Sequence, residues 1–192
     1  IGDDPKLLRP MNFPDGTPGV GSGIYDAAGG RKVMIIHPMG RLFMEPIDDP
    51  FAAVDDALKN HRLGHSVDAI VVDFHCEATS EKQGMGHFLD GRVSAVVGTH
   101  THAPTADAQV LPGGTAFLTD IGMTGDYDSV IGMKKEVATS RFTTQMRQGR
   151  LEPAEGVATL CAVYVETDNA TGLATHIAPL RLGGRLKEEW PV

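Results

Sequence analysis

The sequence predicts a layered α/β protein with parallel strands in its first half and antiparallel hairpins in its second half. In the first half, short apolar runs alternate with helical patterns, which is the order of βαβ units. In the second half, apolar runs are joined by Gly-rich turns, which indicate hairpins. With 192 residues, 41% of them hydrophobic, the chain is long enough to bury a sizeable core, and we expect a single domain over residues 1–192.

Residues 6–30 are rich in Pro, Gly and Asp, and we expect a long surface or active-site loop there. Residues 32–37 form a nearly continuous apolar run, typical of a strand covered on both faces. Asp48-Asp49-Pro50 opens the clearest helix. Its apolar stripe consists of Phe51, Val54, Leu58 and Leu63. The next expected elements are a strand at 67–74, a helix through 79–89 and a strand at 92–98.

The sequence pattern changes after His102, from alternating strands and helices to hairpins. Residues 109–111 and 115–119 flank Pro112-Gly113-Gly114, which predicts a hairpin. Residues 120–128 are expected to be a loop, and residues 132–146 a helix. Two final strands, 156–167 and 173–182, are joined by the turn sequence Asp168-Asn169-Ala170-Thr171-Gly172.

The composition excludes several classes of function. A formal charge of −8 and a pI near 5.4 argue against an extended nucleic-acid surface. The sequence has no apolar run of about 18 residues and no signal-peptide pattern, which predicts a cytoplasmic protein without a membrane segment. Cys76 and Cys161 fall in or beside strands, which favours reduced, buried thiols. The sequence leaves a homo-oligomer open.

The motif with the most chemical content is Gly98-Thr99-His100-Thr101-His102, together with His75. His100 and His102 are two residues apart, so on an extended backbone both imidazoles would point to the same side. His75 follows the preceding strand at the same point. Because parallel strand ends lie about 4.8 Å apart, we expect the three rings to converge on a metal site.

Acidic residues near this motif could orient its rings. Asp73, Glu77 and Asp107 are candidates to accept a ring N–H from a ligand histidine, although each could equally be a solvated carboxylate. His37 ends a strand at the same sheet edge and is a weaker additional candidate. The other four histidines have no comparable setting and are expected at the surface: His61, His65, His87 and His176.

Three stretches of the sequence carry a resemblance to a known family. They are Asp73-Phe74-His75-Cys76-Glu77-Ala78-Thr79-Ser80-Glu81-Lys82, residues 90–102 and Thr119-Asp120-Ile121-Gly122-Met123-Thr124-Gly125. Together they resemble the bacterial metallophosphoesterases of the 2′,3′-cyclic-nucleotide phosphodiesterase type. The resemblance runs from about Leu8 to the C-terminal strands. It implies a four-layer αββα sandwich and a phosphoric diester hydrolase with two divalent metal ions, iron or manganese.

The resemblance also implies roles for the histidines. His75 and His100 would bind one metal ion and His102 the other. The family pattern further includes a strand carrying an Asp ligand, a bridging acidic residue and an Asn-His pair that supplies a ligand and the general acid. None of these has a counterpart upstream of Leu8. His37-Pro38 also departs from the family, which usually has an Asn-containing strand end there.

The missing half of the family pattern predicts an N-terminally truncated chain. Residue 1 is an isoleucine rather than an initiating methionine, and we expect the opposing carboxylates and the general-acid histidine to lie upstream of Ile1. No residue of the chain itself is then assigned as the catalytic acid. We therefore expect the 192-residue chain to be inactive alone.

Two alternatives from other classes stay open. One is a mononuclear metal hydrolase of amide or lactone bonds that uses the same three histidines. The other is a non-catalytic regulatory or scaffold protein that has retained the fold. Metal analysis separates the second alternative from the catalytic ones, because it predicts less than about one metal ion per chain.

Overall fold

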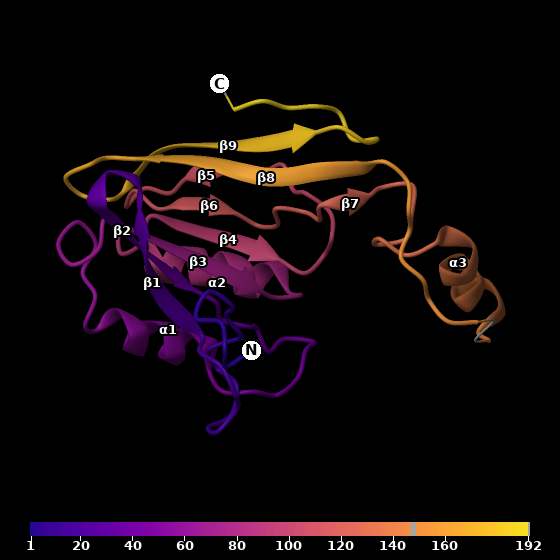
Figure 1. Ribbon diagram of the computed structural model, residues 1–192, viewed down its shortest axis with the longest axis horizontal. Helices are drawn as coiled ribbons and strands as arrows, with labels where there is room; N and C mark the ends of the chain where they lie inside the picture. Colours follow the sequence, from indigo (N-terminus) through magenta and orange to yellow (C-terminus); the bar gives the residue numbers. More distant parts are fainter. Residues whose placement is uncertain (147–148, 192) are drawn as a thin grey trace.

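A six-stranded sheet forms the centre of the computed structural model, which describes residues 1–146 and 149–191 (Figure 1). Its strands lie in the order β1-β2-β3-β4-β6-β5. Their bounds are β1 Ser22–Ala27, β2 Arg31–Ile36, β3 Ala69–His75, β4 Ala95–Thr99, β5 Gln109–Val110 and β6 Ala116–Leu118. The four inner strands β2, β3, β4 and β6 are parallel, whereas β1 and β5 pair antiparallel at the edges. The predicted α/β class, with parallel strands first, is confirmed.

Two helices connect the parallel strands. Helix α1, Pro50–Leu58, links β2 to β3, and its N-cap Asp49 accepts hydrogen bonds from the backbone N–H groups of Phe51 and Ala52. Helix α2, Thr79–Leu89, links β3 to β4 and has the predicted bounds. Val54 and Leu89 bury one face of each helix against the sheet. The βαβ order predicted from the sequence is therefore correct.

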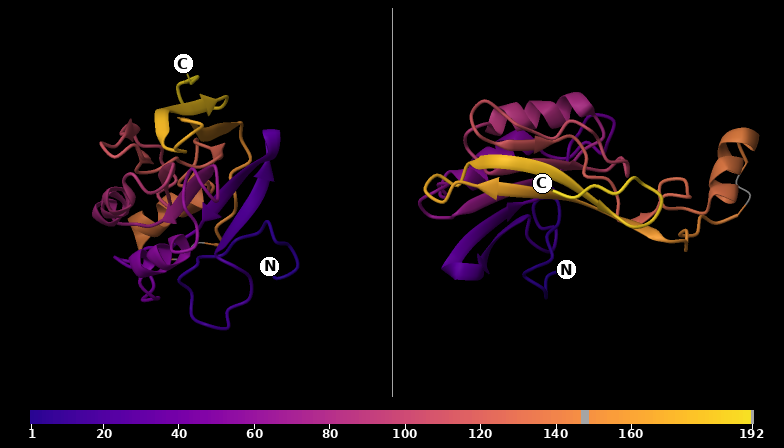
Figure 2. Two further views of the ribbon diagram at one scale, coloured as in Figure 1. Left: turned by 90° about the vertical axis from the view of Figure 1, so that its left-hand side faces the viewer. Right: turned by 90° about the horizontal axis from the view of Figure 1, so that it is seen from above.

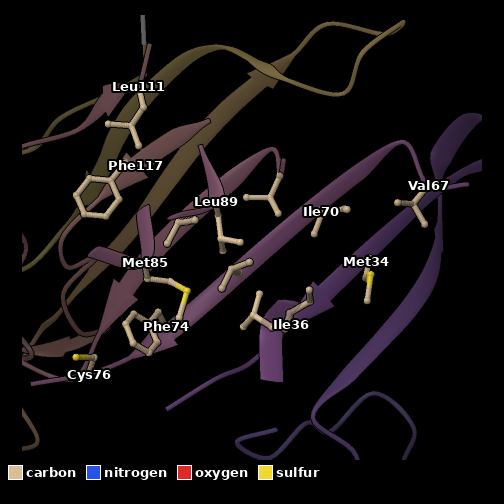
Figure 3. Packing of buried hydrophobic residues seen from close by; sticks show 14 residues of the cluster. Met34, Ile36, Val67, Ile70, Phe74, Cys76, Met85, Leu89, Leu111 and Phe117 are labelled. Atoms are coloured by element: carbon tan, nitrogen blue, oxygen red, sulfur yellow. The ribbon is translucent and has the colours of Figure 1, made fainter. Parts of the chain in front are cut away.

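The main core lies between these helices and the sheet (Figure 3). Side chains from alternate positions of the central strands meet side chains of α1 and α2 there, as the period of a pleated strand requires. The fully buried ones include Ile36, Ile70, Val72, Phe74, Val54, Met85 and Leu89. Burying such apolar side chains contributes about 1.5–3 kcal/mol each, so this layer stabilises the fold strongly.

A second sheet covers the opposite face of the first. It consists of β7 Gly125–Asp126, β8 Ala158–Thr167 and β9 Ala174–Leu182, all antiparallel. Strand β9 packs on β5 and β6, and a smaller apolar cluster that includes Leu118 and Ile177 fills the space between the sheets. The ribbon views show β8 and β9 lying across the six-stranded sheet, on the side of β5 and β6 (Figures 1 and 2). The residues described thus form three layers: helix, sheet and sheet.

The structure corrects three boundaries. Residues 22–27, expected to be part of a loop, form the edge strand β1, which pairs with β2 from Ser22↔Ile36 to Ala27↔Arg31. None of its residues is fully buried and it lacks an apolar run, so a burial pattern could not reveal it. The short strand β7 lies inside the expected loop 120–128. Helix α3, Lys135–Thr144, is shorter than the expected 132–146 and lies apart from the two sheets (Figure 1).

Other expectations are met. Both cysteines are buried and free. The hairpin of β8 and β9 forms at the predicted turn, where the Asp168 carboxylate accepts the backbone N–H groups of Ala170 and Thr171. Within residues 1–146 and 149–191, no helix is long and apolar enough to cross a membrane.

Candidate metal centre at the carboxyl edge of the sheet

The carboxyl ends of β2, β3 and β4 bring polar side chains to one edge of the sheet. His75 ends β3 and pairs in register with Thr99, the last residue of β4. His100 follows at once, and His37 follows β2. The rings of His75 and His100 meet edge to face with centroids 4.8 Å apart, and the ring of His37 lies 6.4 Å from that of His75. Ligands of open α/β sheets bind at such an edge.

A chain of hydrogen bonds orients the His75 ring. The Thr99 hydroxyl donates to the Asp73 carboxylate at 2.9 Å, so its oxygen accepts from His75 Nδ1 at 3.1 Å. With Nδ1 protonated, neutral His75 has a free lone pair on Nε2. That nitrogen lies 3.0 Å from Nδ1 of His100. Asp73 therefore supports His75 indirectly, through Thr99, rather than by accepting its ring N–H as the sequence suggested.

The turn after β4 is not extended. Strand β4 ends at Thr99, and both histidines have positive φ, 120° at His100 and 63° at His102. Such values are uncommon for residues other than glycine and often mark functional sites. The predicted extended backbone, with both imidazoles on one side, is therefore wrong, because the chain bends at each histidine.

His102 contacts the loop that precedes α3. Its Nδ1 lies 2.9 Å from the carbonyl oxygen of Ile131, so this nitrogen must donate and the neutral ring keeps its lone pair on Nε2. In the part of the chain that the structure describes, no group of three or more His, Cys, Asp or Glu side chains could hold a metal ion. Convergence of three rings on one spot is thus not observed: the structure brings His75 and His100 together, with His102 outside their group.

The acidic candidates differ in position. Glu77 lies beside the histidines, with Oε2 2.9 Å from Nε2 of His100. Asp107 contacts a threonine instead: its carboxylate accepts the Thr119 hydroxyl at 2.5 Å and the Thr119 backbone N–H at 3.3 Å. The role expected for Asp107 beside a ligand histidine is therefore not supported by its contacts.

The general-acid histidine was predicted to lie upstream of Ile1. The described residues begin there, so that expectation stays a prediction. Ile1 itself is half exposed, with its side chain beside Gly19, and an aliphatic side chain can neither ligate a metal ion nor transfer a proton. Ile1 is therefore not a member of the candidate site.

The electrostatics of the histidine edge favour a neutral His75. Burial lowers the pKa of His75, and the neighbouring rings of His100 and His37 lower it further. Burial also acts on His37, but the hydrogen bonds and charge of Asp73 outweigh it and raise the pKa of His37. Burial would raise the pKa of Asp73, yet the contacts with His37 and Thr99 outweigh that effect and lower it. A neutral imidazole is the form that binds a metal ion.

Sequence reasoning missed a buried ion pair behind the histidines. Nζ of Lys82, in the first turn of α2, lies 2.7 Å from Oδ2 of Asp120, and both side chains are 1% exposed. Burial disfavours the charged carboxylate, but the hydrogen bond from Lys82 and the N–H groups of Thr101 and Gly122 outweigh burial and lower the pKa of Asp120. The only sequence signal was that both residues fall in stretches that resemble the family.

A second charged residue of the same helix turn is also buried. Glu81 accepts the backbone N–H groups of Arg41 and Leu42 at 3.0–3.1 Å and the Cys76 thiol at 3.2 Å. It therefore ties the loop after β2 to the start of α2. Burial, followed by the Glu81 contact, raises the pKa of Cys76 to about 12, which makes this thiol unsuited to nucleophilic chemistry.

The geometry of His75 and His100 fits a shared metal ion. His75 Nε2 and His100 Nδ1 lie 3.0 Å apart, within hydrogen-bond distance, so both nitrogens face the same point and could be ligands of one metal ion. The hydrogen bond to Thr99 occupies Nδ1 of His75, so its Nε2 is the nitrogen that faces His100, and partners of ligand histidines commonly fix a ring in this way. These two rings can supply two ligands of one ion, and His102 Nε2 can supply a ligand to a separate one.

A family model described as "YmdB-like protein" matches residues 1–180. The chain is similar to the 2′,3′-cyclic-nucleotide 2′-phosphodiesterase of Bacillus subtilis (strain 168), with 47% identity over 177 residues, which are 92% of this chain and 66% of that protein. It is also similar to a putative phosphatase/phosphodiesterase of Mycoplasma genitalium, with 34% identity over 92% of this chain and 63% of the relative.

Two solved structures share the fold. One is a hypothetical protein from Thermus thermophilus, with a TM-score of 0.85 and 43% identity over 92% of this chain and 67% of that chain. The other is described as a novel phosphatase from Mycoplasma pneumoniae, with a TM-score of 0.83 and 31% identity over 95% of this chain and 65% of that one. The chain spans less than two thirds of the length of the curated relatives named above.

Proposed function

The chain belongs to the YmdB-like protein family, and from that premise we propose that it is part of a metal-dependent phosphodiesterase that hydrolyses phosphate diesters such as 2′,3′-cyclic nucleotides. The observation that carries the proposal is the 3.0 Å separation of His75 Nε2 and His100 Nδ1, with the opposite side of the His75 ring held by Thr99. The printed activity of the Bacillus subtilis relative supports the substrate class.

In the proposed centre, His75 and His100 hold one divalent metal ion and His102 holds a second, iron or manganese. When bound, such ions stabilise charge on the phosphoryl oxygens and lower the pKa of a coordinated water. Thr99 and Asp73 keep the proton of His75 on Nδ1, so that Nε2 stays free to bind. Glu77 accepts from the outer nitrogen of His100 and orients that ring.

The proposal needs ligands beyond these three rings. The three rings give each ion only one or two nitrogen ligands. A dinuclear centre also needs a bridging carboxylate, which these rings do not supply. The general-acid histidine of the family pattern is likewise expected before Ile1. We therefore propose that the 192-residue chain alone does not turn over, and that the complete protein provides the remaining ligands and the acid.

The outer face of the second sheet suggests how the four-layer sandwich is completed. Its cross-strand neighbours are apolar and at most partly buried: Leu160 with Leu182, Ala162 with Leu180, and Tyr164 with Ala178. Leu160 is 41% exposed and Tyr164 44%. An apolar sheet face of this kind requires a packing partner, so we propose that a helical layer covers it in the complete protein.

The test is hydrolysis of bis-p-nitrophenyl phosphate and 2′,3′-cyclic AMP by the complete protein, stripped with chelator and reloaded with Mn²⁺ or Fe²⁺. We expect activity only after reloading, and a loss of about 10²-fold or more on His75→Ala or His100→Ala. His87→Ala, an exposed histidine of α2, is the matched control and should leave turnover unchanged.

Three outcomes would contradict parts of the proposal. Full activity of the stripped protein would refute metal dependence. Amide or lactone hydrolysis without diesterase activity would favour the mononuclear alternative. Turnover by the 192-residue chain at the rate of the complete protein would refute the need for further ligands.

A further inference from the structure

The buried pair of Lys82 and Asp120 joins helix α2 to the turn that carries His100 and His102. Isolating two charges from water is expensive unless their remaining hydrogen-bonding capacity is also satisfied. The backbone of the turn supplies further donors to the carboxylate: Oδ2 of Asp120 accepts Lys82 Nζ and the Thr101 N–H, the latter at 3.0 Å. Thr101 is the residue between the two histidines.

Asp120 also fastens the far side of His102. Its backbone N–H donates to the Thr105 hydroxyl at 2.9 Å, and its carbonyl oxygen accepts the Thr105 N–H at 3.0 Å. Oδ1 accepts the Gly122 N–H at 2.9 Å, which fixes the orientation of the carboxylate. Residues 101 and 105 are thus both held by one residue, and His102 lies between them.

The backbone of this turn needs such support. His100 and His102 both have positive φ, a conformation that costs about 1–3 kcal/mol for a residue other than glycine and persists only where surrounding contacts impose it. The hydrogen bond from the Thr101 N–H to Asp120 lies between the two strained residues. Its loss would let the turn relax and move both rings.

We infer that Asp120, held in place by Lys82, is a positioning residue that fixes the strained turn in which His100 and His102 present their ring nitrogens to metal ions. Neither Lys82 nor Asp120 is proposed to bind metal. The inference rests on the proposed function, because the position of these rings matters for catalysis only if they are ligands.

A purely structural role and a positioning role of Lys82 and Asp120 predict different effects of substitution on metal binding. Replacing a buried ion pair by apolar residues of similar size is often neutral or stabilising, so a purely structural pair could be exchanged without harm. In Lys82→Met/Asp120→Leu both charges are removed together, and the Thr101 N–H loses its acceptor. In Asp120→Asn, the amide oxygen at the Oδ2 position keeps the Thr101 N–H bonded, whereas Lys82 loses its counter-charge and the Gly122 N–H loses the acceptor that Oδ1 provided.

The experiment compares these variants in the complete protein by Mn²⁺ titration, thermal unfolding and hydrogen exchange of the Thr101 amide without metal. We expect the folded double variant to bind Mn²⁺ about 10- to 100-fold more weakly and to lose protection at Thr101, because the Thr101 and Gly122 N–H groups lose their acceptor. Asp120→Asn should be less stable yet keep its Mn²⁺ affinity within a few-fold.

Asp90→Asn is the matched control. Asp90 caps the other end of α2 and accepts the backbone N–H groups of Gly113 and Thr115, far from the histidines. It should lower the unfolding temperature without changing the Mn²⁺ affinity. If the double variant does not fold, Lys82→Met/Asp120→Ala, which introduces a smaller side chain, takes its place.

Wild-type Mn²⁺ affinity and wild-type protection of Thr101 in the folded double variant would overturn the inference. Absence of Mn²⁺ binding by the wild-type protein would instead refute the proposed function. In that case the exchange of the Thr101 amide still decides whether Asp120 holds the turn, so the two failures are distinguishable.

Discussion

Gly98→Ala is expected to destabilise the fold directly behind the candidate site. A Cβ at Gly98 would lie 1.7 Å from the carbonyl oxygen of Thr119, 2.7 Å from its carbonyl carbon and 3.0 Å from Cδ of Lys82. Two of these three atoms belong to the backbone and cannot rotate away. The chain segments of residues 98 and 119 would have to separate by more than about 1 Å to relieve the overlap.

Two contributions set the size of the effect. Inserting a methyl group into a packed region costs about 1–3 kcal/mol through strain and displacement of neighbours. The separation would also weaken the hydrogen bond from the Ile121 N–H to the Gly98 carbonyl oxygen, 2.9 Å long, which contributes about 0.5–1.5 kcal/mol. We therefore expect the free energy of unfolding to fall by about 2–4 kcal/mol.

Urea unfolding of the metal-free complete protein, followed by circular dichroism, measures this change. Gly84→Ala is the matched control, because Gly84 lies on the exposed side of α2 and a Cβ there would meet nothing closer than Phe51 Cζ at 3.7 Å. That variant should gain about 0.5–1 kcal/mol, since alanine favours a helix interior over glycine. Equal unfolding midpoints for Gly98→Ala and the wild type would refute the reasoning.

Three further predictions follow from contacts in the same region. Asp49→Ala removes the N-cap of α1 and should lower the free energy of unfolding by about 1 kcal/mol in urea, whereas an unchanged midpoint would show that the cap contributes nothing. Cys76, with its pKa raised to about 12, should resist iodoacetamide at pH 8 in the native protein, and Glu81→Ala should speed its labelling, as followed by mass spectrometry; rapid labelling of the wild type would contradict the burial of this thiol. The pKa of His37 is raised through Asp73, so this ring stabilises the fold below its unfolded pKa of 6.5 and loses that contribution as the pH rises through its folded pKa. His37→Gln should therefore be more destabilising at pH 5.5 than at pH 8.5 in metal-free protein, and an equal difference at both values would count against the pairing.

Local pattern in the sequence was enough for most of the fold. The apolar runs at β2, β3 and β4, the Asp49-Pro50 start of α1 and the turn between β8 and β9 each encode burial or backbone geometry within a few residues, and the structure forms those elements there. Strand β1 was missed because an exposed edge strand is specified by its pairing with β2 rather than by its own pattern.

For the candidate site, the sequence determined that His75 and His100 arrive at neighbouring strand ends, since parallel order and strand length follow from the βαβ pattern. Only the tertiary structure decided the rest. Asp120 meets Lys82 across 38 positions, and Asp107 turns to Thr119 rather than to a histidine. Such contacts depend on how whole layers pack, because the folded geometry brings together hydrogen-bond partners that are distant in sequence. No local or periodic sequence pattern predicts these pairs.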